Sequence, residues 1–100
     1  MVLVTRSPNR ITLKGHAGYA QQGEDIVCAA VSILAQTLIK SVEDLTTGKI
    51  QYSISPGSVD IKHGNLSASA QTLMDSFFIG IRMIADEYPD NVRIAQAFKA

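Results

Sequence analysis

The feature that most constrains this chain is a hydrophobic pattern whose period changes along the sequence. Four short runs rich in β-branched and aromatic residues occur in two pairs, 2–6 with 11–16 and 50–55 with 58–63. A segment containing Pro-Asn separates the first pair and a Pro-Gly dipeptide separates the second, and both are typical of turns. The pattern therefore predicts two β-hairpins.

Each hairpin is followed by apolar residues at spacings of three and four, which is typical of one face of an amphipathic helix. The first helix is expected to begin after Asp25 and to end at Gly48, and the second to end near Tyr88-Pro89, because proline cannot continue a helix. Asp25 is suited to cap the first helix, since its carboxylate can accept from first-turn amides. This cap would place Cys28 at the third helical position.

The predicted element order is β-β-α-β-β-α in a single domain spanning residues 1–100. A hydrophobic content of 46% and a charged content of 18% suit one compact core. Strand pairs interleaved with single helices predict an α+β fold, a two-layer sandwich in which two long helices back a four-stranded, mainly antiparallel sheet. Residues 91–100 carry no clear pattern.

Composition argues against several classes of partner and cofactor. Nine basic side chains balance nine acidic ones, so no positive field attracts nucleic acid, and no apolar stretch is expected to reach the roughly eighteen residues of a membrane span. We therefore expect a cytoplasmic protein without direct nucleic-acid or membrane partners. Cys28, His16 and His63 are one soft ligand short of a structural zinc site, so no metal or other cofactor is expected.

Cys28 and His16 are the candidates for chemistry. A thiol attacks as its thiolate, and the amides at a helix N-terminus, equivalent to roughly half a positive charge, favour an anion. Unpaired amides in the same turn are candidates to stabilise an oxyanion. His16 follows a strand, and a glycine-bearing loop connects it to the helix, so the chain can bring imidazole to sulfur. This loop, from Gly15 to Gly23, has no large aliphatic residue, and we expect nothing in it to be anchored in the core.

Each of these residues also has a structural interpretation. A lone cysteine such as Cys28 is more often a small core residue than a nucleophile, and His16 and Asp25 taken singly are more often a strand-end residue and a plain cap. Ser32, one turn after Cys28, either forms a hydrogen bond near the site or bonds back to the carbonyl of Cys28. His63 has no cysteine nearby and is interpreted as structural.

The second helix carries Phe77, Phe78 and Ile79 in succession, so these side chains cannot all point the same way. Part of the helix is therefore expected to be buried by a second subunit, which predicts a homodimer.

The segment from Gly15 to Ser32 begins with Gly-His-Ala and continues to Gly-x-Asp-Ile-Val-Cys-Ala-Ala-x-Ser. This pattern closely resembles the signature of the bacterial ribosomal-processing cysteine proteases (Prp, the YsxB-like family), and the likeness extends over the whole chain in length and element order. By this resemblance His16 matches the general base and Cys28 the nucleophile. Asp25 and Ser32 match supporting positions beside them.

The resemblance implies a cysteine endopeptidase required for ribosome maturation. Members of the family remove a short N-terminal extension from the twenty-seventh large-subunit ribosomal protein, cutting after a pair of aromatic residues in an apolar peptide. The expected partner is therefore the peptide of this ribosomal protein precursor. The loop composition suits a flexible segment that opens for the peptide and then orders over it, and its residues are Ala17, Gly18, Tyr19, Ala20, Gln21, Gln22 and Gly23.

Two other functions stay open from the sequence. The main alternative is a non-catalytic ribosome-associated or ribosome-assembly binding protein in which Cys28 is packed in the core. RNA binding is disfavoured by the zero net charge and by the content of only 6% aromatic residues.

Overall fold

The structure is a computed structural model that describes residues 1–21 and 23–96. Both predicted hairpins and both predicted helices are confirmed within one or a few residues of their expected bounds. The described part of the chain forms these elements in order: β1 (Val2–Ser7), β2 (Arg10–Lys14), α1 (Ile26–Leu45), β3 (Ile50–Ser55), β4 (Ser58–His63), α2 (Ala68–Glu87) and β5 (Val92–Gln96).

The sheet has five strands in the order β3-β4-β2-β1-β5 and is mixed. All neighbouring pairs are antiparallel except β1 and β5, which run parallel with Val4 opposite Ile94. The prediction of four strands is therefore wrong, because residues 92–96 form a strand where no pattern was apparent. This strand is only five residues long, and it pairs with a segment some ninety residues earlier in the chain after a crossover through α2.

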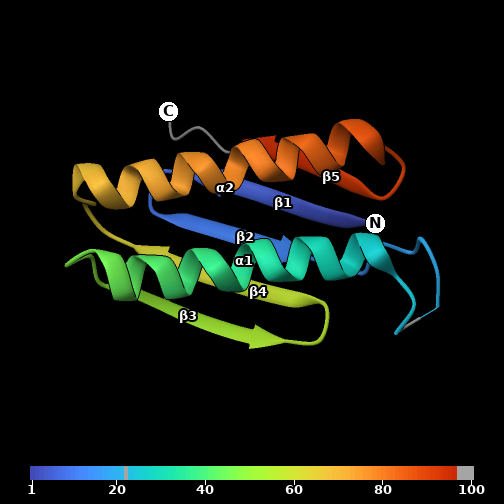
Figure 1. Ribbon diagram of the computed structural model, residues 1–100, viewed down its shortest axis with the longest axis horizontal. Coiled ribbons are helices and arrows are strands. Elements are labelled where there is room, and N and C mark those ends of the chain that lie inside the picture. The colour runs from blue at the N-terminus through green and yellow to red at the C-terminus, as the bar shows by residue number, and fades with distance from the viewer. Residues whose placement is uncertain (22, 97–100) are drawn as a thin grey trace.

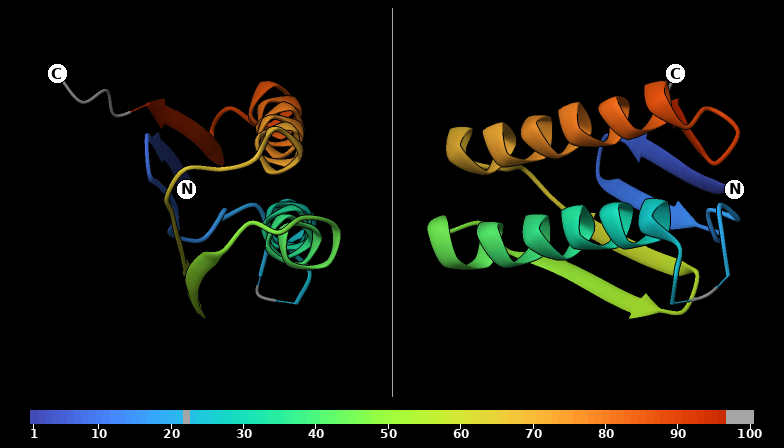
Figure 2. Two further views of the ribbon diagram at one scale, coloured as in Figure 1. Left: turned by 90° about the vertical axis from the view of Figure 1, so that its left-hand side faces the viewer. Right: turned by 45° about the vertical axis from the view of Figure 1, so that its right-hand side comes forward.

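Both helices cover the same face of the sheet, which confirms the two-layer arrangement (Figures 1 and 2). Alternate residues of the strands point towards the helices, as the period of two predicts. Val4, Ile11 and Ile61 are each at most 1% exposed on this face. The helices meet them with the buried residues Val27, Val31, Ala35, Leu38, Ile39 and Val42 of α1 and Ala70, Met74, Phe77, Phe78 and Ile81 of α2.

By length and composition alone α1 could cross a membrane, which corrects the expectation that no segment is apolar enough. The core helix of a globular domain has the same composition, and the buried stripe of α1 packs within the core cluster shared with the sheet and α2. This packing accounts for the apolar content of the helix.

Phe77 and Phe78 are both buried within this one chain, whereas Ile79 is 57% exposed. The two rings pack edge to face with their centroids 5.0 Å apart. Arg6 covers Phe78 with its guanidinium carbon 4.5 Å from the ring centroid, and its Nη2 donates to Asp75 Oδ1 at 3.0 Å. A second subunit is therefore not needed to bury either phenylalanine, and the argument from these rings to a homodimer fails.

Candidate active site

His16 follows the end of β2 at a turn that only glycine can make. Gly15 has a φ of +102°, and a Cβ built on it would lie 2.2 Å from the carbonyl oxygen of Met1. The carbonyl of His16 in turn accepts from the amino group of Met1. The backbone on both sides of the histidine is thus fixed by the start of β1.

The imidazole of His16 lies against the turn between β3 and β4. A Cβ built on Gly57 would be 2.8 Å from Nε2 of His16 and 3.2 Å from Cε1, so the ring rests where a side chain would otherwise stand. The turn is tied to the same segment, because Gly15 N donates to the carbonyl of Gly57 at 2.9 Å. The sequence predicted this turn but gave no sign that it touches His16.

Asp25 is the N-cap of α1, as predicted, and it also holds the preceding loop. Its Oδ1 accepts from the amide of Cys28 at 2.9 Å, and its Oδ2 accepts from the amides of Tyr19 at 3.0 Å and Ala20 at 3.3 Å. The Cys28 amide, followed by those of Ala20 and Tyr19, holds the pKa of the Asp25 carboxyl below its usual range. Within the described residues neither oxygen bonds to His16, so Asp25 acts here as a cap and a loop tie.

Cys28 is half-buried at the third position of α1 and packs against the edge of the core. The expectation of free first-turn amides is wrong for the amide of Cys28 itself, because Asp25 Oδ1 already occupies it. This amide can serve an oxyanion only if the carboxylate releases it. Across residues 1–21 and 23–96, no hydrogen bond joins the thiol of Cys28 to His16. This does not argue against a catalytic pair, because hydrogen bonds between catalytic groups often form only when substrate binds.

The loop after His16 is attached to the body of the protein through residues that the sequence did not single out. Ala17 is 1% exposed, so the expectation that nothing in this loop reaches the core is wrong at this residue. Its carbonyl accepts from Asn91 Nδ2 at 2.9 Å, and the ring of Tyr19 packs edge to face on Tyr88 with centroids 5.3 Å apart. Asn91 and Tyr88 lie between α2 and β5, in and beside the tail that carried no clear pattern.

Ser32 and Gln22 are the remaining residues that the sequence assigned to the site. Ser32 is exposed one turn after Cys28, and its hydroxyl forms no hydrogen bond within the described part of the chain. Gln22 lies outside the described residues. No group of three His, Cys, Asp or Glu side chains able to hold a metal ion occurs among the residues that the structure describes.

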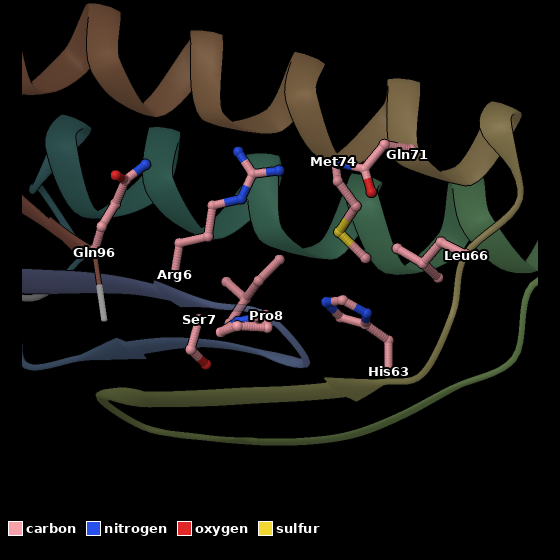
Figure 3. Close-up of a pocket in the computed structure, with 9 residues that line it drawn as sticks. Arg6, Ser7, Pro8, His63, Leu66, Gln71, Met74 and Gln96 are labelled. Atoms are coloured by element: carbon pink, nitrogen blue, oxygen red, sulfur yellow. The ribbon is translucent and has the colours of Figure 1, made fainter. Parts of the chain in front are cut away.

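His63 lies at the opposite end of the sheet, where β4 ends and α2 begins. It lines a cavity of about 280 Å³ between the sheet and α2, into which His63 and Met74 both point (Figure 3). Its Nδ1 lies 3.0 Å from the carbonyl oxygen of Gly64. This cavity shares no lining residue with the His16 and Cys28 region, in keeping with the structural interpretation of His63.

Two substitutions at Asp25 are expected to separate a capping role from the orientation of His16. Asparagine keeps the cap bond to the Cys28 amide through its carbonyl oxygen, but its NH2 group cannot accept from the amides of Tyr19 and Ala20. Asp25→Asn should therefore lose about threefold in activity, whereas Asp25→Ala, which loses all three hydrogen bonds, should lose about tenfold. The measurement is kcat/KM for the peptide cleavage that the sequence resemblance implies. If Asp25 oriented His16, the asparagine variant would instead lose about 10⁴-fold, as orienting aspartates do in serine proteases.

The lowered pKa of Asp25 also predicts a dependence of stability on pH. The folded protein holds this proton less tightly than the unfolded chain, so ionised Asp25 stabilises the fold above the ordinary pKa of 3.8. That stabilisation is lost as the pH falls through the lowered pKa. As the pH is lowered from about 5 to about 2, the unfolding temperature should therefore fall more steeply for the wild type than for Asp25→Asn. Parallel curves for the two proteins would contradict this assignment.

Comparison with known proteins identifies similar chains. A family model described as cysteine protease Prp matches residues 2–93. The ribosomal processing cysteine protease Prp of Mycoplasma genitalium is 27% identical over 96 residues, which cover 94% of each chain. That of Staphylococcus aureus strain Mu50 is 26% identical over 87 residues, covering 84% of this chain and 82% of the relative.

A solved structure shares the fold. It is the crystal structure of an essential ribosomal processing protease Prp from S. aureus in complex with a covalently linked product peptide. It superposes with a TM-score of 0.93 at 22% identity and covers 97% of this chain and 100% of its own. At this identity the likeness concerns the fold, including the fifth strand.

Proposed function

Because the chain belongs to the cysteine protease Prp family, we propose that it is a cysteine endopeptidase that removes a short N-terminal extension from the twenty-seventh large-subunit ribosomal protein. The observation that carries the proposal is the position of Cys28 in the first turn of α1, tied through Asp25 to the loop that begins at His16. The N-terminal turn of α1, which carries the half-buried Cys28, and the end of β2, which the exposed His16 follows, lie at the same end of the sheet (Figure 1).

The proposed reaction uses the two side chains in turn. His16 takes the thiol proton, and the thiolate of Cys28 attacks the carbonyl carbon of the scissile peptide bond. The bond to nitrogen breaks, the amine leaves with the proton from His16, and an acyl group stays on sulfur as a thioester. Water then attacks the thioester with His16 as base, which releases the new carboxyl end and restores the thiol.

Catalysis requires the imidazole of His16 to reach the thiol of Cys28, and we assign this movement to the loop from Ala17 to Gly23. The thiol and imidazole are not hydrogen-bonded, while this loop is held by Asp25, Tyr88 and Asn91 at its first residues. We therefore propose that the loop closes over the bound peptide and that this closure brings His16 into reach of Cys28. Ser32, exposed on the following turn, is proposed to support the site from the same side of the helix.

A synthetic peptide tests the function directly. The purified protein is incubated with an apolar peptide that carries Phe-Phe, and the products are identified by mass spectrometry. A single cut after the second phenylalanine is expected. Absence of a cut in every extension peptide tried would favour the non-catalytic binding role.

Thiol reactivity separates the protease from a binding protein that keeps Cys28 as a packing residue. A catalytic Cys28 should react with iodoacetamide at neutral pH faster than a free cysteine, and His16→Ala should remove that excess. Equal, slow reaction in both proteins would indicate a buried structural thiol. Intact mass spectrometry over time gives both rates.

Three further properties stay proposals for this chain: a homodimer, a cytoplasmic location and the absence of direct nucleic-acid contact. The exposed Ile33, Ile79 and Met83 on the two helices provide apolar surface for a second copy, since they are 57–68% exposed. Light scattering coupled to size-exclusion chromatography determines the oligomeric state.

A further inference from the structure

The turn between α2 and β5, residues 88–91, lies at the same end of the molecule as the loop that follows β2 (Figure 2). Its backbone is held from both sides, because Tyr88 N donates to Ile84 O at 2.8 Å and Val92 N donates to Tyr88 O at 3.1 Å. Pro89 restricts the turn further, since the proline ring fixes φ. The turn is therefore a firmly held support beside the candidate active site.

Asn91 ends this turn and forms hydrogen bonds with two other segments of the chain. Its backbone carbonyl accepts from Val2 N at 2.8 Å, at the start of the parallel ladder between β1 and β5. Its side-chain Nδ2 donates to the carbonyl oxygen of Ala17 at 2.9 Å, and the two residues are 74 positions apart. Because β1 lies between β5 and β2 in the sheet, the side chain reaches past the start of β1 to the segment after β2.

The residue that Asn91 holds is the one directly after His16. Ala17 is 1% exposed, and the hydrogen bond to its carbonyl is partly buried. A carbonyl in such a place is poorly hydrated, so removal of its donor leaves an unsatisfied acceptor and favours a shift of the backbone. The side chain of Asn91 therefore fixes the chain immediately after the histidine.

The imidazole of His16 depends on its backbone for its position, because the side chain is exposed. Its ring rests on the turn at Gly57, where an added Cβ would lie 2.8 Å from Nε2. Before the histidine, Gly15 N donates to the carbonyl of the same Gly57 at 2.9 Å. The backbone is thus fixed at Gly15 on one side of His16 and at Ala17 on the other, and Asn91 supplies the second of these attachments.

We propose that Asn91 is a positioning residue for the reaction, whose side-chain amide holds Ala17 so that the imidazole of His16 stands where it can reach Cys28. The proposal rests on the proposed function, in which His16 acts as the base. Within the described residues Asn91 forms no hydrogen bond with either the imidazole or the thiol, so it acts through the backbone. The effect on rate is large because a displacement of about 1 Å in a catalytic group costs on the order of 100-fold.

Two substitutions at Asn91 test the effect on the reaction. Asn91→Ala removes the donor, and Asn91→Asp keeps the size of the side chain but presents a carboxylate, which cannot donate to the carbonyl of Ala17. Each should lower kcat for the Phe-Phe peptide by between about 10-fold and 100-fold, because the imidazole is displaced. KM should stay within about twofold of the wild-type value, since the contacts with the peptide are kept.

Ser67→Ala is the matched control for a general loss of stability. Ser67 caps α2 at its other end, and its hydroxyl oxygen accepts from Ala70 N at 3.2 Å in a similarly part-buried place. This variant also loses one hydrogen bond between a side chain and the backbone, but far from His16. It should lower the unfolding temperature about as much as Asn91→Ala and keep the wild-type kcat. An equal loss of kcat in Ser67→Ala and Asn91→Ala, or the wild-type kcat in both Asn91 variants, would overturn the proposal.

A second measurement reports the position of the ring without any cleavage. In NMR spectra of the wild type, nuclear Overhauser effects are expected between the imidazole protons of His16 and the Hα protons of Gly57, because the ring rests on that glycine. These effects should weaken in both Asn91 variants and persist in Ser67→Ala. Undiminished effects in the Asn91 variants would overturn the proposal. Weakened effects in these variants, with no cleavage by the wild type, would refute the proposed function but leave the hold of Asn91 on His16 intact.

Discussion

Cys28→Ala is expected to abolish cleavage of the extension peptide, with a loss in kcat/KM of at least about 10⁴-fold. Alanine has no nucleophile, so the thioester cannot form. The thiol is half-buried and small, and the change should alter the free energy of unfolding by no more than about 1 kcal/mol. Product formation by mass spectrometry and thermal unfolding of the same samples measure the two effects.

Cys28→Ser is the conservative counterpart of this variant. A hydroxyl keeps the size of the side chain but is a weak nucleophile at its ordinary pKa, so we expect a loss of similar size. His16→Ala should fall into the same range, because residues that act as a unit do not lose activity additively. A Cys28→Ala protein that still cuts the peptide at the same bond would refute the mechanism.

Gly57→Ala should lower kcat/KM about 100-fold although Gly57 carries no side chain of its own. The added Cβ would lie 2.8 Å from Nε2 of His16 and 3.3 Å from Cδ2, so the imidazole must move away from the turn. A displacement of about 1 Å in a catalytic group costs on the order of 100-fold. The experiment compares kcat/KM and the rate of Cys28 alkylation in wild type and variant.

Backbone strain is the competing explanation for an effect of Gly57→Ala, and Gly18 provides the control. Gly57 has a φ of +69° and Gly18 one of +71°, but a Cβ on Gly18 would meet nothing within 4 Å. Both alanine variants should lose about 1–2 kcal/mol of stability at most. If Gly57→Ala shows that loss and yet keeps wild-type alkylation and cleavage rates, His16 does not depend on the turn.

Local patterns were sufficient to predict most of the fold. The Pro-Gly turn placed β3 and β4 at their observed bounds, and the carboxylate of Asp25 before an apolar stripe predicted the N-cap and the place of Cys28 in the first turn. These features depend on neighbouring residues, which is why the sequence alone carries them.

The missed features depend on contacts between distant segments. Strand β5 is stabilised by pairing with β1, and its Val92 and Ile94 alternate over too few residues to be distinctive. Phe78 is buried together with Phe77, and Arg6 from β1 covers the ring of Phe78, a contact that no local pattern contains. Helical periodicity alone therefore predicted a narrower buried face of α2 than the structure has.

In the candidate site, too, some features follow from the local sequence and others depend on contacts between distant segments. His16 and Cys28 were found from their motif, whereas the groups that hold their surroundings come from elsewhere in the chain: Gly57 from the second hairpin, and Asn91 and Tyr88 from the connection before β5. Long-range packing places these groups, and none of them has a motif of its own.

Processing of the intact ribosomal precursor tests the central claim most directly. The twenty-seventh large-subunit ribosomal protein of the same organism, with its N-terminal extension, is incubated with the wild-type protein or with Cys28→Ala, and the intact masses are recorded. We predict one shortened protein with the wild type and none with the variant. A precursor that stays full length with the wild type, or that both proteins shorten equally, would contradict the assignment of this chain as the Cys28-dependent processing protease.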